Sequence, residues 1–180
     1  MQSPFVIRCA RPDERVALEE LQRRASLAWE EYREALLAHP GAIDLPLEQI
    51  EAGRTYVAER FGEKLGFSVV FKRSDGNAEL DGLFVEPAHW RQGVGALLVR
   101  EAARFATAEG AQSLCVIANP MALRFYEACG FQMEGELQTQ FGKGVLMRKP
   151  LRTAGTRWLP SPIPLHQLSR PFRLAHFAAR

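Results

Sequence analysis

A glycine pair set between an apolar run and a helix-like segment constrains this chain more than any other feature. The stretch "FVEPAHWRQGVGALLVREA" covers residues 84–102, and its glycines are Gly93 and Gly95. Glycine has no Cβ and lets backbone approach a ligand closely. The first N–H groups of a helix have no partner within it and favour an anion. The stretch therefore predicts a strand, an anion-binding loop and a helix, in that order.

The loop matches neither of two common phosphate-binding patterns. A dinucleotide fingerprint that starts at Gly93 requires glycine at position 98, which is Leu98. A P-loop requires Lys and then Ser or Thr after its last glycine, whereas Gly95 is followed by alanine and leucine. The glycine pair alone is also compatible with a tight strand-to-helix turn, so its meaning depends on the rest of the chain.

Hydrophobic periodicity and turn residues predict an α+β domain with a mixed, mostly antiparallel sheet of about seven strands and about four helices. The expected strands lie within 5–10, 54–87 (three strands), 113–118 and 131–151 (two strands). The expected helices span 11–29, 30–38, 94–109 and 119–130. On the helix at 94–109, helical spacing predicts a buried stripe of Val94, Leu98, Ala102 and Phe105.

Length and charge predict one domain with an appendage. The chain has 180 residues, of which 47% are hydrophobic, enough for one well-cored domain at 1–151. The extension at 152–180 has five arginines and no acid, which leaves the domain at −3 out of a formal net charge of +2. This balance argues against a nucleic-acid-binding face on the domain. The apolar, proline-containing extension is expected to pack on the domain or on a homodimer partner.

Compartment and metal content are further expectations. No apolar run approaches the length of a membrane span, and the first residues carry charges where a signal peptide would be apolar, so we expect a cytoplasmic protein. Cys9, Cys115 and Cys129 are odd in number, form no CxxC and have apolar neighbours, which predicts reduced, buried thiols. The four histidines have no metal-ligand spacing, so no metal is expected.

Two motifs together give the chain a family resemblance. "ELDGLFVEPAHWRQGVGALLV", followed by a strand and by "NPMALRFYEACGF", resembles the GNAT superfamily of acyl-CoA-dependent N-acyltransferases. The element order is similar over residues 5–150, and the specific motifs lie within 79–131. The resemblance implies a fold in α/β/α layers, acetyl-CoA as co-substrate and an amine as acceptor. It also implies that coenzyme A pyrophosphate binds the backbone of Arg91, Gln92, Gly93, Val94, Gly95 and Ala96.

The resemblance also assigns residues to the rest of the cofactor. It places Asn119 beside the pantetheine amides and Tyr126 beside the thioester sulfur. The strand backbone at Leu83, Phe84 and Val85 would bind pantetheine, with an N–H around Phe84 or Val85 holding the thioester oxygen. Asn119 is also a good helix cap, and Tyr126 is also compatible with a half-buried aromatic residue that has no catalytic role.

One position departs from the family pattern. The family usually has Gln or Arg three residues before the first glycine of the pair, and this chain has Trp90 there. Backbone donors are unaffected by such a change, so the departure concerns the role of that side chain and not the anion site.

Acyl transfer to an amine requires a proton acceptor for the amine and a proton donor for the departing thiolate. Glu79 lies where some family members carry a catalytic glutamate, and we prefer it to Asp81 as the base. Water, without a dedicated carboxylate base, is the alternative. Tyr126 is the expected acid. Strand alternation predicts that Glu79, Asp81, Leu83 and Val85 share one face, while Leu80, Gly82 and Phe84 share the other. Either carboxylate can instead be a hydrogen-bonded rim residue.

The sequence alone identifies neither the acceptor nor whether the protein is catalytic. The stretch "LAWEEYREALLAHPGAID" is the expected acceptor wall, with Trp29, Glu30, Glu31, Tyr32, Glu34 and Asp44 as candidates. A small amine, an amino acid and a protein amine all fit. A non-catalytic acyl-CoA-binding sensor or regulatory module is the alternative, and it would need the glycine pair but neither Tyr126 nor a carboxylate.

Overall fold

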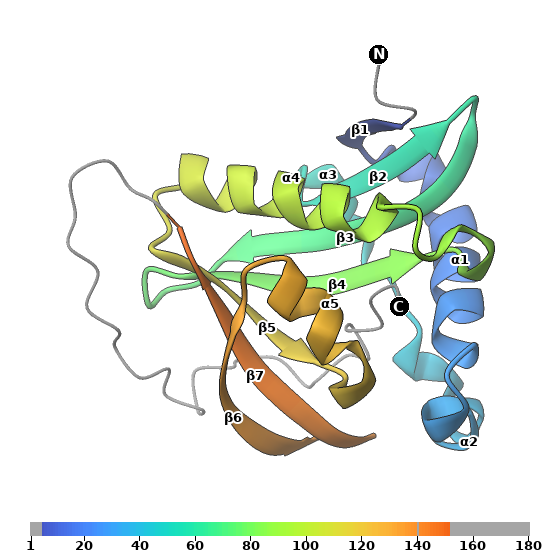
Figure 1. The fold of residues 1–180 in the computed structure, drawn as a ribbon. Coiled ribbons are helices and arrows are strands. Elements are labelled where there is room, and N and C mark those ends of the chain that lie inside the picture. The colour runs from blue at the N-terminus through green and yellow to red at the C-terminus, as the bar shows by residue number, and fades with distance from the viewer. Residues whose placement is uncertain (1–4, 140, 152–180) are drawn as a thin grey trace.

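A computed structural model of the chain describes residues 5–139 and 141–151, and the extension predicted at 152–180 lies outside them. The fold is α+β, with a mixed seven-stranded sheet in the order β1-β2-β3-β4-β5-β7-β6 (Figure 1). Neighbouring strands are antiparallel except β4 and β5, which are parallel. The strands are β1 (Val6–Cys9), β2 (Thr55–Arg60), β3 (Glu63–Lys72), β4 (Ala78–Val85), β5 (Ser113–Ala118), β6 (Gln132–Thr139) and β7 (Gly142–Pro150).

Helices cover both faces of this sheet, which confirms the predicted fold class. The α-helices are α1 (Arg15–Leu27), α2 (Glu30–Ala38), α3 (Leu47–Glu51), α4 (Val94–Ala108) and α5 (Leu123–Ala128). Helices α4 and α5 lie on one face, and α1 and α2 lie on the other (Figure 1). The short helix α3 was not predicted, because five residues after Pro46 are too few to show a helical period.

The sheet separates the two larger of the three hydrophobic clusters found among the described residues. The predicted stripe of α4 is buried at Val94, Leu98 and Ala102, and it packs on β3, β4 and β5. On the opposite face, α1 and the start of α2 bury Leu18 and Trp29 against the sheet. Each core therefore fixes one helical layer, and strand β4 lies between them.

A β-bulge in β4 overturns the predicted alternation of its side chains. Val69 of β3 lies opposite Gly82 and Val70 lies opposite Leu80, so Asp81 is the extra residue. Leu80 and Leu83 consequently share the α4 core, although they are three residues apart. Strict alternation was wrong because one extra residue reverses the facing of everything beyond it. Glu79 therefore does not share a face with Leu83.

The parallel pair β4 and β5 separates soon after it forms. Only Ala78 with Leu114 and Glu79 with Cys115 are in register. Strand β5 stays paired with β7 over its whole length, Ser113–Ala118, so it cannot follow β4. The two strands diverge toward their carboxyl ends, and α5 lies in front of the opening (Figure 1). We call this opening the β4–β5 gap.

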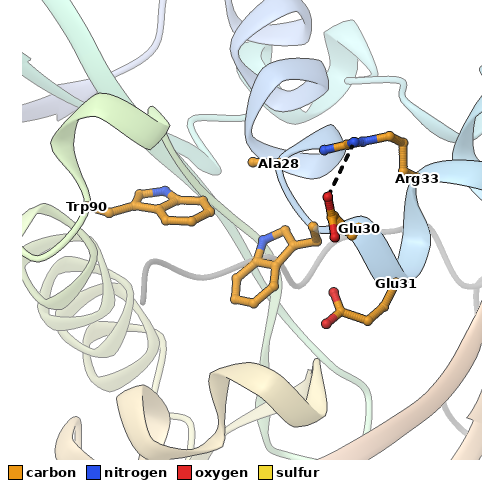
Figure 2. A pocket seen from close by; sticks show the side chains of 6 residues that line it. Ala28, Glu30, Glu31, Arg33 and Trp90 are labelled. Carbon is orange, nitrogen blue, oxygen red and sulfur yellow. Dashed lines mark ion pairs between the residues drawn. The ribbon is translucent and has the colours of Figure 1, made fainter.

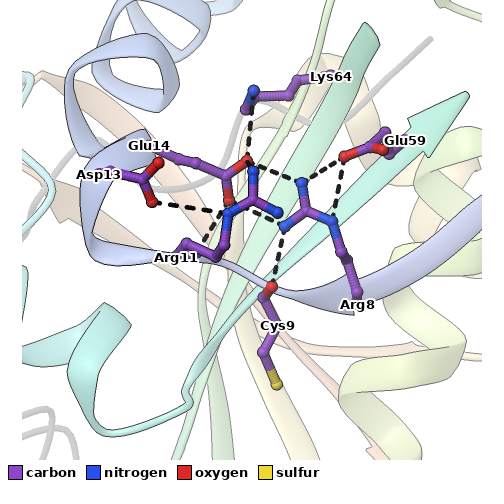
Figure 3. A network of polar contacts seen from close by, with 7 residues as sticks. All are labelled: Arg8, Cys9, Arg11, Asp13, Glu14, Glu59 and Lys64. Carbon is purple, nitrogen blue, oxygen red and sulfur yellow. Dashed lines mark hydrogen bonds and ion pairs between the residues drawn. The ribbon is translucent and has the colours of Figure 1, made fainter. Parts of the chain in front are cut away.

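A buried carboxylate holds the start of α1 to the sheet (Figure 3). Glu14 is 3% exposed and accepts hydrogen bonds from the Arg8 guanidinium at 2.7 and 2.9 Å. The backbone N–H of Arg11 donates to it at 2.9 Å, and Lys64 Nζ lies 3.3 Å away. Arg8 also pairs with Glu59. This set joins β1, β2, β3 and the turn before α1.

Replacing Glu14 by glutamine is expected to destabilise the fold by about 3 kcal/mol at pH 7. The hydrogen bonds from Arg8 lower the pKa of Glu14 from 4.5 to about 2. A lowered carboxyl pKa means that the stabilisation is complete above pH 4.5 and is lost as pH falls toward 2. Chemical denaturation at pH 7 and pH 3 measures both effects. The exposed Glu20 gives a matched control, and equal losses for the two variants would contradict the prediction.

Other expectations meet mixed outcomes in the part of the chain that the structure describes. Cys115 is buried and Cys129 is partly buried, but Cys9 is exposed, so the prediction of a buried thiol was wrong there. Cys9 ends β1, an edge strand that pairs only with β2. Over the described ranges, no helix is long and apolar enough to cross a membrane. No metal-ligand cluster is found among the same residues.

Candidate active site

The glycine loop forms as predicted between β4 and α4. Gly93 is the residue before the first helical turn, with a left-handed φ of +85°, and because it has no side chain it makes no capping hydrogen bond to α4. A Cβ at Gly93 would meet nothing within 4 Å, so the backbone conformation and not a neighbour favours glycine. Arg91 and Gln92 are exposed beside it. The first N–H groups of α4, from Val94 onward, are therefore available to an anion.

Trp90 anchors this loop from within. Its indole Nε1 donates to the Val85 carbonyl at 2.8 Å. Its ring centroid lies 5.4 Å from that of Trp29, at the junction of α1 and α2. Arg24 of α1 adds a two-pronged ion pair to Glu86, at 3.0 Å. Trp90, the residue that departs from the family pattern, thus connects the loop to the α1–α2 junction. This role could not be predicted, because its partner Trp29 lies 61 positions away in the sequence.

Some backbone N–H groups of β4 point into the β4–β5 gap. The N–H of Glu86 donates to the Leu65 carbonyl of β3 at 2.8 Å. Successive backbone amides point to opposite edges of a strand, so the N–H of Phe84 also faces β3. The N–H groups of Leu83 and Val85 consequently face the gap. The side chain of Phe84 packs on Phe67 on the α1 side, at 5.1 Å between centroids.

Asn119 directly follows β5 and serves as a helix cap, as predicted. Its Oδ1 accepts a hydrogen bond from the Met121 N–H at 2.9 Å. The Tyr32 hydroxyl donates to the same oxygen at 3.3 Å. Its Nδ2 is buried and has no hydrogen-bond partner among the described residues. The amide oxygen therefore caps the helical turn, and the buried amide nitrogen has no described partner.

Tyr126 is fully buried, and not half-buried as a non-catalytic aromatic residue at this position was expected to be. Its side chain is 0% exposed, and its ring packs on Phe125 and Phe131 at 5.1 and 5.4 Å. The hydroxyl has no hydrogen-bond partner within the described ranges. Burial raises the pKa of Tyr126 well above its ordinary value. Tyr126 shares the α4-side core with Leu83 and Val85, the residues whose backbone faces the gap.

Glu79 lies where the gap begins, on the face opposite Tyr126. It is the last β4 residue that pairs with β5. Its neighbours Ala78 and Leu80 are buried in the α4-side core, so the Glu79 side chain faces away from α4. Arg73 Nη1 donates to Glu79 at 3.2 Å. Burial, and then the charge of Asp81, outweigh this cation and raise the pKa of Glu79 to about 7. Asp81 itself accepts a hydrogen bond from Gln49 of α3 at 3.3 Å.

A pocket of about 320 Å³ lies between the α1–α2 junction and the glycine loop (Figure 2). Of the expected acceptor wall, Trp29, Glu30 and Glu31 line it, and Trp90 closes the other side. Arg33 also lines the pocket and lies 3.9 Å from Glu30. Asp44 instead pairs with Arg15 at 3.3 Å. The wall predicted from sequence is thus divided between a pocket and a structural ion pair.

Comparison with known proteins now decides the family. The model of the acetyltransferase (GNAT) family matches residues 18–131, more than half of the chain. The chain belongs to the GNAT family. The rat protein N-acetyltransferase family 8 member 3 is 30% identical to this GNAT chain over 122 residues, which are 62% of this chain and 53% of the rat protein. The chain thus spans about half the length of that relative.

Solved GNAT structures share the fold. The paia N-acetyltransferase from Thermoplasma acidophilum, solved in complex with coenzyme A, aligns with a TM-score of 0.68 and 21% identity. The alignment covers 82% of this chain and 99% of that one. The yncA protein from Salmonella typhimurium, solved with acetyl-CoA, aligns with a TM-score of 0.65 and 19% identity over 86% and 98% of the two chains. The separated β4 and β5 therefore belong to a GNAT fold.

Proposed function

We propose that this GNAT protein is an N-acetyltransferase that moves an acetyl group from acetyl-CoA to a primary amine by direct attack. One observation carries the proposal: Asn119 Nδ2 and the Tyr126 hydroxyl are buried donors without described partners, where Asn119 directly follows β5 and Tyr126 packs with Leu83 and Val85 of β4. Buried polar groups are normally paired, so two such groups indicate a ligand that pairs them. The neighbours solved with coenzyme A and acetyl-CoA give the ligand class.

The residues present fit such a cofactor along its whole length. The α4 N–H groups from Val94 to Ala96 would bind the pyrophosphate, with Arg91 within reach as a charged donor. Asn119 Nδ2 would donate to a pantetheine carbonyl. The N–H groups of Leu83 and Val85 face the gap and would bind the rest of the pantetheine and the acyl oxygen. Acetyl-CoA supplies the thioester carbonyl and a thiolate leaving group when bound.

Proton transfer is divided between the two faces of the sheet. Glu79, directly or through water, would take the proton of the attacking amine, since a pKa of about 7 suits a general base at neutral pH. Tyr126 would return a proton to the departing sulfur. Its raised pKa keeps the hydroxyl protonated, and the same burial raises the pKa of a thiol beside it, so the transfer between them stays feasible.

The pH profile tests the base directly. For the wild type we expect kcat/KM to fall below about pH 7, where Glu79 becomes protonated. Glu79→Gln should remove this acid limb and leave only the titration of the amine substrate. Asp81→Asn is the matched control: the Asp81 charge raises the Glu79 pKa, so its removal should move the limb to lower pH and not abolish it. Loss of the limb in Asp81→Asn alone would make Asp81 the base.

The function itself is tested with a panel of amines. Purified protein and acetyl-CoA are incubated with small amines, amino acids and peptides, and released thiol is measured. Thiol release that depends on the amine supports an acetyltransferase and narrows the acceptor. Tight binding of acetyl-CoA with no turnover on any amine would favour a sensor module and contradict the proposal.

A further inference from the structure

We infer that Tyr32 is a positioning residue that holds Asn119 in its cofactor-binding orientation and so links the acceptor side of the protein to donor affinity. The inference rests on the proposed function, because it deepens the role of Asn119 toward coenzyme A. Tyr32 lies on α2, and Asn119 directly follows β5. Their hydrogen bond joins two residues that are 87 positions apart in the sequence, and it connects α2 directly to the end of β5.

The contact reaches three elements at one point. The Tyr32 hydroxyl lies 3.3 Å from Asn119 Oδ1 and 3.5 Å from the Lys143 carbonyl of β7. A Cβ on Gly142 would lie 3.6 Å from the Tyr32 ring, so the ring packs against the β6–β7 turn. The ring pair of His39 and Phe141, 6.1 Å apart, adds a second contact between the end of α2 and this turn. Tyr32 is therefore held in place from both sides.

Two donors fix the Asn119 amide from different directions. The Met121 N–H determines which amide atom faces the helix, because a backbone donor cannot accept a hydrogen bond from Nδ2. The Tyr32 hydroxyl then limits rotation of the amide plane about the remaining side-chain torsion. Burial raises the pKa of Tyr32, which keeps this hydroxyl a donor across the neutral range. Nδ2 is consequently preorganised toward the β4–β5 gap before a ligand arrives.

Preorganisation of one hydrogen bond has a modest, measurable value. A typical net hydrogen bond contributes about 0.5–1.5 kcal/mol, so its loss should weaken binding roughly two- to tenfold. Tyr32→Phe removes only the hydroxyl and keeps the ring packing. We therefore expect a rise of that size in the Kd for coenzyme A, with the melting temperature lowered by about 2–4 °C at most.

A double-mutant cycle on the full chain, with coenzyme A binding measured by calorimetry, tests the inference. Tyr32→Phe should weaken binding in the wild-type background and have no further effect in an Asn119→Ala background. Tyr56→Phe is the control, since Tyr56 is also partly buried and packs on Phe105 away from the gap. An unchanged Kd in Tyr32→Phe, or an undiminished effect in the Asn119→Ala background, overturns the positioning role. Failure of the wild type to bind coenzyme A would instead overturn the proposed function.

Discussion

Tyr126→Phe is expected to lower kcat by roughly 10²- to 10⁴-fold, the range typical of a lost general acid. The change removes one hydroxyl and little volume, so the ring packing on Phe125 and Phe131 should persist. Affinity for acetyl-CoA should stay near that of the wild type, because the hydroxyl acts on the departing sulfur. Steady-state kinetics with a saturating amine, together with calorimetry, separates the two quantities.

Stability provides the control for Tyr126→Phe. The hydroxyl is buried without a described partner, so its removal should leave the melting temperature unchanged or raise it. A fall in kcat together with a raised melting temperature would place the hydroxyl in function and not in packing. Equal losses of turnover and of cofactor affinity would show that Tyr126 only shapes the site.

Gly93→Asp is expected to abolish measurable binding of coenzyme A. A carboxylate about 4 Å from a phosphate charge costs about 4 kcal/mol at an effective dielectric constant of about 20, roughly a thousandfold in affinity. Gly93 has space for a side chain, since a Cβ there meets nothing within 4 Å. The protein should therefore still fold, and calorimetry on folded protein measures the affinity.

Gly93→Asn separates charge from shape. Asparagine and aspartate have the same size, and both tolerate the left-handed φ of +85° better than other side chains. Asparagine should therefore weaken coenzyme A binding much less than aspartate does. Similar losses in both variants would show that the side chain, and not its charge, disturbs the site, and unimpaired binding in both would remove the anion site from the glycine loop.

Much of the fold could be predicted because its signals are local. The glycine pair, the cap at Asn119 and the period of α4 all lie within single stretches of chain, and they led to the correct order of the described strands and helices except α3. The bulge at Asp81 had no such signal, since it depends on how β4 aligns with β3. Register is a property of two strands, so the facing of Leu83 could not be read from one.

The candidate site likewise contains residues that local motifs predict and residues that they do not. Gly93, Asn119 and Tyr126 belong to motifs that are contiguous in sequence, and the structure buries Asn119 Nδ2 and the Tyr126 hydroxyl without a described hydrogen-bond partner. Other site contacts are not visible in those motifs: Arg73 pairs with Glu79 across a hairpin turn. Trp29 of the α1–α2 junction packs on Trp90, and Tyr32 of α2 donates to Asn119. These side chains look like ordinary core or surface residues until tertiary packing pairs them. Long-range partners therefore escape prediction even where the motif residues do not.

The bulge at Asp81 also bears on how two substrates would reach the proposed site. Because it turns Leu83 toward α4 and leaves Glu79 facing away from it, the opening is served by the backbone and tyrosine on one side and by a carboxylate on the other. Reactants that approach from opposite faces of a sheet do not compete for one volume. Under the proposed function, the donor and the acceptor would then be bound at the same time, and the thiol product would leave by a different route from the acylated amine. In that mechanism the one-residue bulge would keep the paths of the two substrates apart.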